Sequence, residues 1–259
     1  MRALQIAASG MVAQQHNAEV VANNLANMNT SGYQRRRTEF NDLLYNAMPR
    51  KDSVSSKAGE VVPGGVQQGL GVRIAAIYRI SEQGNLQATD NAFDLAIQGR
   101  GYFQVQLPNG DVAYTRNGTF QLNGAGQLVT HDGFSLQPSI LIPPGSIDVT
   151  INASGEVLAK QDGVQQLANV GTVQITTFPN EAGLRAIGDN LFRETQASGP
   201  ASAGTPGTAG YGTVLQGFVE TSNVNPVEEI AALIKAQRAY EMNSKVIQTA
   251  DQMLAPSRN

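Results

Sequence analysis

The sequence predicts an α+β fold in which N- and C-terminal helices pair as a coiled coil and the central domain is antiparallel and all-β. Two observations support it. Residues at helical apolar spacing are confined to the two ends of the chain, and Asn-Gly pairs separate short alternating runs in the middle. The expected organisation is 1–45 for an N-terminal helix and turn, 46–72 for an extended loop, 73–220 for the β domain and 221–259 for a C-terminal helix.

The first helix is predicted over residues 3–28. Small and apolar residues there alternate steps of four and three, the spacing of a heptad seam, and no proline interrupts the first 48 residues. At 1.5 Å per residue the helix would be roughly 39 Å long. It should end in the segment NMNTSG, where Gly32 favours a turn. The candidate subunit-packing residues on this helix are Leu4, Ala8, Met11, Ala18, Ala22 and Leu25, and Gln15 holds the remaining seam position.

A run of three basic residues, Arg35, Arg36 and Arg37, follows the turn. Three residues are few for a nucleic-acid patch, which usually spreads many cations along a phosphate backbone. Two interpretations remain open. The arginines are either solvated loop residues or an inter-subunit polar contact with acidic groups on a neighbouring copy.

The middle of the chain is predicted to be an antiparallel meander preceded by an extended loop. Residues 46–72 are rich in Gly, Ser and Pro, which favours such a loop. Short alternating runs then fill residues 95–137, with turn signals at Asn109-Gly110, Asn117-Gly118, Asn123-Gly124 and Asp132-Gly133. The segments IDVTINASGEVLAK, VGTVQITTF and TVLQGFVET extend the pattern. Only Ser, Gly, Pro, Ala and Thr occupy residues 198–210, which we expect to form a flexible loop.

The last helix is predicted to begin at Pro226. Asn225 is the candidate N-cap, Pro226 takes the first helical position and Glu228 the third, which is a capping-box arrangement. The helix should end near Leu254, at a length of roughly 43 Å. Nothing nearby in sequence covers its apolar stripe, so the two terminal helices must cover each other or be covered by other copies. The candidate packing residues here are Ile230, Leu233, Ile234, Tyr240, Ile247 and Leu254.

Chemistry-bearing motifs are absent from the sequence. The chain has no Cys, which excludes disulfides and thiol chemistry, and neither His16 nor His131 has a partner at metal-ligand spacing. No run approaches the roughly 18 apolar residues of a membrane span. We therefore nominate no catalytic, cofactor-binding or metal-ligating residue, and expect no enzyme activity, no cofactor and no membrane insertion.

The composition favours an amide-rich surface of low charge. The net charge is −3, and 20 Asn and 23 Gln outnumber the 18 basic and 21 acidic residues. Such a surface barely repels its own copies, which suits a self-assembling protein, but it is equally compatible with an ordinary soluble protein of low charge. Nothing in the charge indicates a nucleic-acid partner.

Three stretches resemble the axial proteins of the bacterial flagellum, the rod and hook family. ANNLANMNTSGYQRR is similar to the N-terminal signature of that family, YTRNGTFQLNGAGQLVTHDG to its central β domain and ETSNVNPVEEIAALIKAQRAYEMNSKVIQTADQML to its C-terminal signature. Within the family the chain most resembles distal rod members, because of its length, its insertion and the segment TTFPNEAGLRAIGDNLFRET. A proximal rod or hook subunit remains an alternative, as does a cell-wall-cleaving enzyme.

The resemblance implies a structural role. Members self-assemble into a helical tube whose inner layer is a coiled coil of the terminal helices and whose outer layer is the β domain. The expected function is a rigid, hollow drive shaft that transmits torque from motor to hook and supports motility. Expected partners are further copies of the chain, proximal rod and hook axial proteins, surrounding ring proteins and the type III export apparatus. The expected location is the basal body in the periplasm, reached without a cleaved signal peptide.

Overall fold

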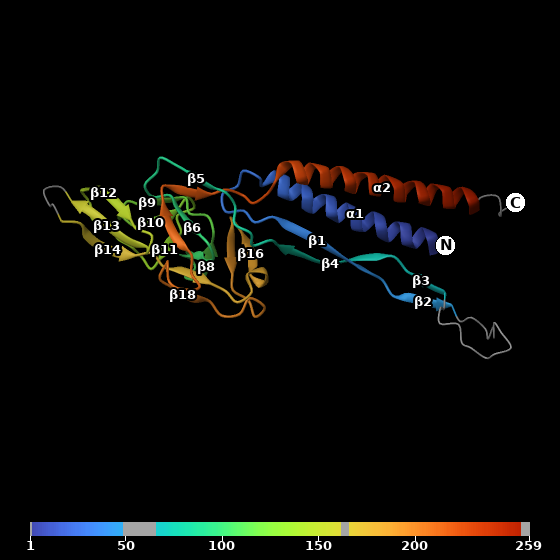
Figure 1. Cartoon of the computed structure of the whole chain (residues 1–259), viewed down its shortest axis with the longest axis horizontal. Coiled ribbons are helices and arrows are strands. Elements are labelled where there is room, and N and C mark those ends of the chain that lie inside the picture. The colour runs from blue at the N-terminus through green and yellow to red at the C-terminus, as the bar shows by residue number, and fades with distance from the viewer. Residues whose placement is uncertain (1, 49–65, 162–165, 255–259) are drawn as a thin grey trace. The chain divides into compact units, whose positions relative to one another are not determined.

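The structure, a computed structural model, describes residues 2–48, 66–161 and 166–254 (Figure 1). The chain divides into two compact units. The helical unit comprises Met1–Leu25, Arg36–Tyr78 and Pro226–Asn259, and the β unit comprises Ala26–Arg35 and Arg79–Asn225. The chain therefore passes between the two units four times along its length.

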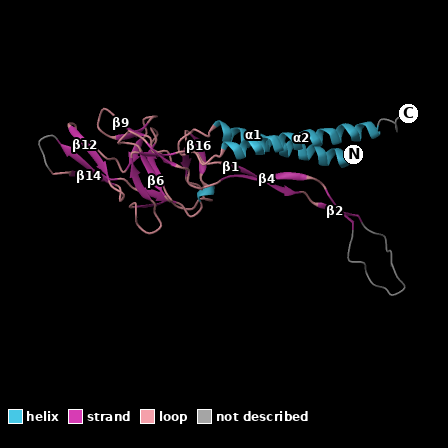
Figure 2. Cartoon of the chain, turned by 45° about the horizontal axis from the view of Figure 1, so that its top comes forward, coloured by secondary structure: helices cyan, strands magenta, loops and turns pink. Residues whose placement is uncertain are grey.

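Two long α-helices, counted over the described residues, form much of the helical unit. Helix α1 spans Arg2–Ala26 and α2 spans Pro226–Leu254, in agreement with the two helices predicted from the sequence. Helix α2 begins at its proline and carries two acidic residues in its first turn, where carboxylates stabilise the positive end of the helix dipole. The two helices lie side by side in both views (Figures 1 and 2).

Two short β ribbons complete the described part of the helical unit. Backbone hydrogen bonds from Ile80 to Arg35 and from Leu43 to Gly71 flank the first ribbon, so its strands run antiparallel. The second ribbon lies within the segment expected to be an extended insertion, of which residues 49–65 are outside the described part of the chain. The strands are β1 (Arg36–Asp42) with β4 (Val72–Arg79), and β2 (Tyr45–Met48) with β3 (Val66–Gly69).

The β unit is built on an antiparallel sheet that joins nine strands among the described residues. Hairpins close at three of the predicted Gly turns, those at Gly110, Gly124 and Gly133. The strands of this sheet are β7 (Tyr102–Gln106), β8 (Val112–Thr115), β9 (Phe120–Leu122), β10 (Leu128–Thr130), β11 (Ser135–Gln137), β15 (Ile175–Thr177), β16 (Arg185–Gly188), β17 (Leu191–Arg193) and β18 (Ser202–Gly204).

Smaller sheets and one short helix complete the described β unit. They are β12 (Ser146–Ile151), β13 (Glu156–Gln161) and β14 (Ala168–Thr172); β6 (Leu95–Gln98) with β19 (Thr213–Gln216); β5 (Leu86–Ala88) with β20 (Phe218–Glu220); and a 3₁₀ helix at Glu181–Gly183. The sequence missed β18, which lies in the expected flexible loop 198–210 and pairs with β15. Its ladder consists of backbone hydrogen bonds, which a segment without large apolar residues can still form.

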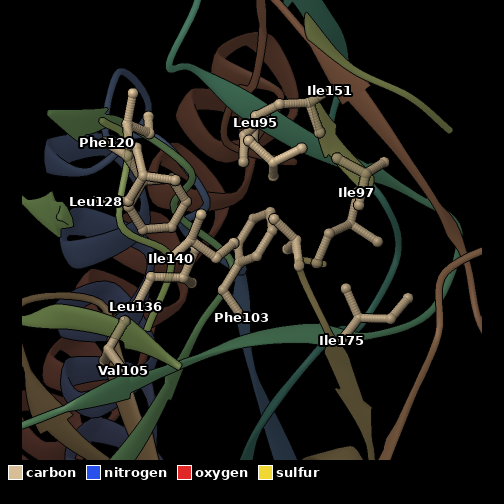
Figure 3. Packing of buried hydrophobic residues seen from close by; sticks show 14 of the residues in the cluster. Leu95, Ile97, Phe103, Val105, Phe120, Leu128, Leu136, Ile140, Ile151 and Ile175 are labelled. Atoms are coloured by element: carbon tan, nitrogen blue, oxygen red, sulfur yellow. The ribbon is translucent and has the colours of Figure 1, made fainter. Parts of the chain in front are cut away.

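The core of the β unit is apolar and contains a second, aromatic cluster. The rings of Phe103 and Phe120 meet edge to face with centroids 5.2 Å apart (Figure 3). Each such fully buried side chain contributes about 2 kcal/mol to stability. The aromatic cluster consists of Tyr102, Tyr114, Phe178, Leu184 and Phe192. The main cluster includes Leu95, Ile97, Phe103, Val105, Phe120, Leu128, Leu136, Ile140, Ile151, Val157, Ile175 and Val214.

The turn after α1 belongs to the β unit and is held there by hydrogen bonds. Gly32 has a positive φ of 68° and its N–H donates to Glu220 O at 2.9 Å. Asn190 Nδ2 donates to Ser31 O at 3.1 Å. This differs from the expected organisation, in which the turn belonged with the N-terminal helix, because these partners are far away in the sequence.

Candidate assembly surface

Small side chains are buried on both helices, and α1 approaches α2 at Gly10 and Asn243. Ala7 and Ala13 are buried on α1, and Ala236 and Ala250 are buried on α2. A Cβ atom added to Gly10 would lie 2.8 Å from Asn243 Nδ2, so the helices approach closely at that point. Small side chains permit this approach but bury little apolar area, so the contact contributes less to stability than a Leu-rich seam would.

A polar cluster joins the end of α1 to the start of α2. Asn24 is 1% exposed, and its Nδ2 donates to Glu229 Oε2 at 3.1 Å and to Arg36 O at 2.8 Å. Asn24 Oδ1 accepts from the N–H of Arg36 at 2.9 Å. One amide side chain of α1 therefore contacts two further elements, α2 and β1.

Large apolar side chains point away from the contact between the two helices. Ile230 and Ile234 on α2 are 46% and 47% exposed, and Val12 on α1 is 55% exposed. An exposed apolar stripe of this kind usually marks an interaction surface. Further exposed residues of the same kind on α2 are Val227, Tyr240, Met242, Val246 and Met253.

The packing residues predicted from the sequence are half-buried or exposed within the single chain. None of those whose side chains the structure describes is fully buried, and Leu254 falls outside the described side chains. Leu4, Met11, Ala18, Leu25, Leu233 and Ile247 are half-buried, whereas Ala8, Ala22, Ile230, Ile234 and Tyr240 are exposed. The predicted stripe thus remains available to cover a neighbour.

Sequence reasoning missed the residues that do pair. On α1 these are Gly10 and Asn24, and on α2 they are Asn243 and Glu229. The same alternation of three and four that selected the predicted seam also fits this second set, which is smaller and more polar. From the sequence we chose the more apolar of the two sets, as is usual for helices that pair through a hydrophobic seam. Small residues such as Gly10 instead indicate where the backbones of two helices approach closely.

The arginine run spans the residue before β1, Arg35, and the first two residues of the strand, Arg36 and Arg37. Arg36 and Arg37 are exposed and Arg35 is half-buried. The Arg35 N–H donates to Asn223 Oδ1 at 2.7 Å. The exposed pair leaves two cationic groups available on the surface of the ribbon.

A small polar cavity of about 170 Å³ lies in the β unit. Arg116 Nε pairs with Glu220 Oε2 at 2.6 Å, and Arg100 Nε pairs with Glu181 Oε1 at 3.0 Å. Burial, followed by the neighbouring Glu181 carboxylate, raises the pKa of Tyr102 to about 12. These groups are neutral or engaged in pairs, an arrangement typical of structural polar contacts. The residues that line the cavity are Gln34, Ser81, Glu82, Gln83, Gly99, Arg100, Arg116, Glu181 and Glu220.

Neither metal-ligand clusters nor membrane-spanning helices are found in the described part of the chain. Over the ranges that the structure describes, no three His, Asp or Glu side chains gather as ligands. Over the same residues, no helix is both long enough and apolar enough to cross a bilayer. The exposed helix faces are therefore the feature of the described structure that most clearly indicates a functional surface.

Three family models match the chain. The model described as "Flagella basal body rod protein" matches residues 4–34, which include α1 and the turn. The "Flagellar hook protein FlgE/F/G D1 domain" matches residues 96–159 in the β unit. The "Flagellar basal body rod FlgEFG protein C-terminal" model matches residues 215–255, which include α2.

Relatives match over nearly their whole length. The flagellar basal-body rod protein FlgG of Caulobacter vibrioides is 57% identical over 254 residues, which cover 98% of this chain and 97% of that protein. FlgG of Agrobacterium fabrum is 50% identical over the same coverage. FlgG of Borreliella burgdorferi is 46% identical over 261 residues, which cover 100% of this chain and 98% of that protein.

Proposed function

The chain belongs to the flagellar basal-body rod protein family and is a structural subunit of the rod, and from this premise we propose how its helices build the shaft. The distal position in the rod fits its FlgG relatives. In the proposed arrangement, α1 and α2 pack as a coiled coil, within one chain and between copies, into a rigid hollow tube. That tube is a drive shaft, which passes torque from motor to hook.

The exposed apolar stripe of α2 carries this proposal. Within one chain, α1 covers only the small-residue face of α2, and Ile230 and Ile234 remain about half exposed. Covering them with helices of neighbouring copies would remove apolar area from water, which favours association. A contact that joins different surfaces on successive copies generates an open helical array when the rotation between copies does not close a ring.

The proposed partners and location follow from family membership. Apart from its own copies, the subunit would contact proximal rod and hook axial proteins and the rings that surround the rod. It would act in the periplasm as part of the basal body, after passing through the flagellar export apparatus without a cleaved signal peptide. The match to a model shared by hook and rod proteins supports a common mode of assembly along the axis.

We propose that the insertion at residues 46–72 stiffens the shaft by bridging neighbouring copies. The described ribbon of β2 and β3 carries exposed apolar side chains at its base, at Leu44 and Tyr45. Deleting residues 49–65 should leave a tube that bends more easily, which electron microscopy of negatively stained assemblies measures as a shorter persistence length. An equally straight tube would contradict the bridging role.

Electron microscopy of the purified full chain tests the assembly proposal. The variant carrying Ile230→Ser and Ile234→Ser should unfold in urea like the unsubstituted chain but form no tubes, because its apolar stripe is interrupted. A matched control on α2 carries Gln237→Ser and Gln248→Ser, two exposed polar positions, and should assemble normally. Normal tubes from the isoleucine variant would show that this face is not the assembly surface.

A further inference from the structure

The contact between α1 and α2 does not determine its own register through apolar packing. The buried small residues of the two helices, among them Ala7, Ala13, Ala236 and Ala250, are nearly interchangeable in size. Sliding one helix along the other by a heptad would place the same face against its partner with similar side chains in contact. Within the helix pair itself, polar contacts are what distinguish the observed register from the shifted ones.

Two contacts fix the observed antiparallel offset. Asn24 meets Glu229 at one end of the pair, and Gly10 meets Asn243 further along. The two contacts lie two heptads apart on α1 and also two heptads apart on α2. They therefore report one register, and the same offset places Val21 opposite Ala232.

We infer that the contact of Asn24 with Glu229 determines the register of the helix pair. The Asn24 amide is 1% exposed and reaches the carboxylate at 3.1 Å. A slide by one heptad in one direction would place Ala236 opposite Asn24, and in the other direction Ser222, which precedes α2. Each alternative breaks the hydrogen bond between the Asn24 amide and the Glu229 carboxylate, and the loss of a hydrogen bond to a buried charged group is costly. A single buried Asn selects register in coiled coils for the same reason.

Asn243 adds a steric component to the same selection. Its amide fits against α1 because Gly10 has no side chain. A slide by one heptad would bring Asn17 or Ala3 opposite Asn243 in place of Gly10, and Ala250 or Ala236 opposite Gly10. The bulky amide would then meet a side chain, and the glycine would leave a gap, so packing is poorer in both shifted registers.

The register matters for assembly, and in this respect the inference rests on the proposed function. A slide by one heptad would move the apolar stripe of α2 by roughly 10 Å relative to α1. A neighbour that fits both helices in one register would not fit them in another. Asn24 is thus a positioning residue that sets the geometry of the exposed faces without belonging to them.

Cysteine cross-linking in the full chain tests the inference, because the chain contains no Cys of its own. Val21→Cys with Ala232→Cys reports the observed register. Val21→Cys with Ala239→Cys reports a slide in one direction, and Gln14→Cys with Ala232→Cys a slide in the other. Disulfide yields under mild oxidation, read on a denaturing gel, give the relative populations, since only cysteines that face each other at short range are joined.

Asn24→Leu should lower the yield of the first pair severalfold and raise that of a shifted pair. The control Gln5→Leu, an exposed amide on the same helix, should leave all yields unchanged. Asn24→Asp, which places two carboxylates together, should also lower the first yield. Adding Glu229→Gln should restore part of it, because the aspartate still lacks the donor that met Arg36 O. Equal yields in Asn24→Leu and Gln5→Leu, or no recovery in the double variant, would overturn the inference. Tube formation is scored separately by microscopy, so a chain with the observed register that makes no tubes would count against the proposed function alone.

Discussion

Arg116 and Glu220 form an ion pair with both side chains buried and with 2.6 Å between Arg116 Nε and Glu220 Oε2. Arg116 also donates to the carbonyls of Gly99 and Gly101, each at 2.6 Å. Glu220 in turn accepts from the N–H of Gly84 at 3.0 Å. The pair therefore ties four segments of the β unit together, and its loss should affect them all.

Glu220→Gln should destabilise the β unit by about 3 kcal/mol or more, because it leaves the Arg116 charge buried without a counter-charge. Urea unfolding followed by circular dichroism measures the change. The matched control is Asp111→Asn, which breaks the Asp111–Arg193 pair at a similar distance of 2.6 Å on the surface. That substitution should cost about 1 kcal/mol or less. Equal losses in the two variants would show that burial of the Arg116 pair is unimportant.

Gly118→Ala should prevent normal folding of the β unit. A Cβ atom at this position would lie 1.6 Å from the carbonyl oxygen of Leu95, a backbone atom that cannot move aside alone. We expect a loss of about 3 kcal/mol or more. Gly124→Ala is the control, because that glycine also follows an Asn and a Cβ there would meet nothing within 4 Å. Its change should stay within about 0.5 kcal/mol in the same urea titration. A tolerated Gly118→Ala would contradict the close approach of these two segments.

The stability of the β unit should fall as the pH rises from 10 to 12. The pKa of Tyr102 is raised from 10.0 to about 12, so in this window the unfolded chain loses the phenol proton while the folded chain keeps it. The stabilisation is complete below pH 10 and is lost as pH passes the folded value, a change of about 3 kcal/mol. Tyr102→Phe removes this titration and should show a shallower decline over the same window, measured by urea unfolding at each pH. Parallel declines for the two proteins would rule out Tyr102 as the cause.

Reversing the charge of the exposed arginines should impair assembly without unfolding the chain. Arg36→Glu with Arg37→Glu leaves the backbone contacts of this segment in place, since those contacts use main-chain atoms. If the arginines meet acidic groups on a neighbouring copy, tubes should be fewer and swimming of complemented cells weaker. Arg185→Glu, an exposed arginine in β16, serves as the control. Unchanged assembly and motility in the double variant would show that these arginines are ordinary solvated side chains without an inter-subunit contact.

Signals carried by adjacent residues determined much of the fold. The capping sequence at Asn225 and Pro226 predicted the start of α2, and helical periodicity predicted both helices to within a few residues. The Gly turns at Gly110 and Gly133 predicted hairpins that the structure contains. Each of these features depends on backbone preferences and spacing over a few positions, which the sequence states directly.

The tertiary structure alone decided which face of each helix is paired. Two different sets of positions on α1 fit the same three-and-four alternation, and the choice between them depends on what α2 presents. Asn24 meets Glu229 across 205 positions of sequence, and Gly118 packs under Leu95 because a strand from elsewhere passes there. Complementarity between distant surfaces is a property of both partners together, so no local pattern in either one specifies it.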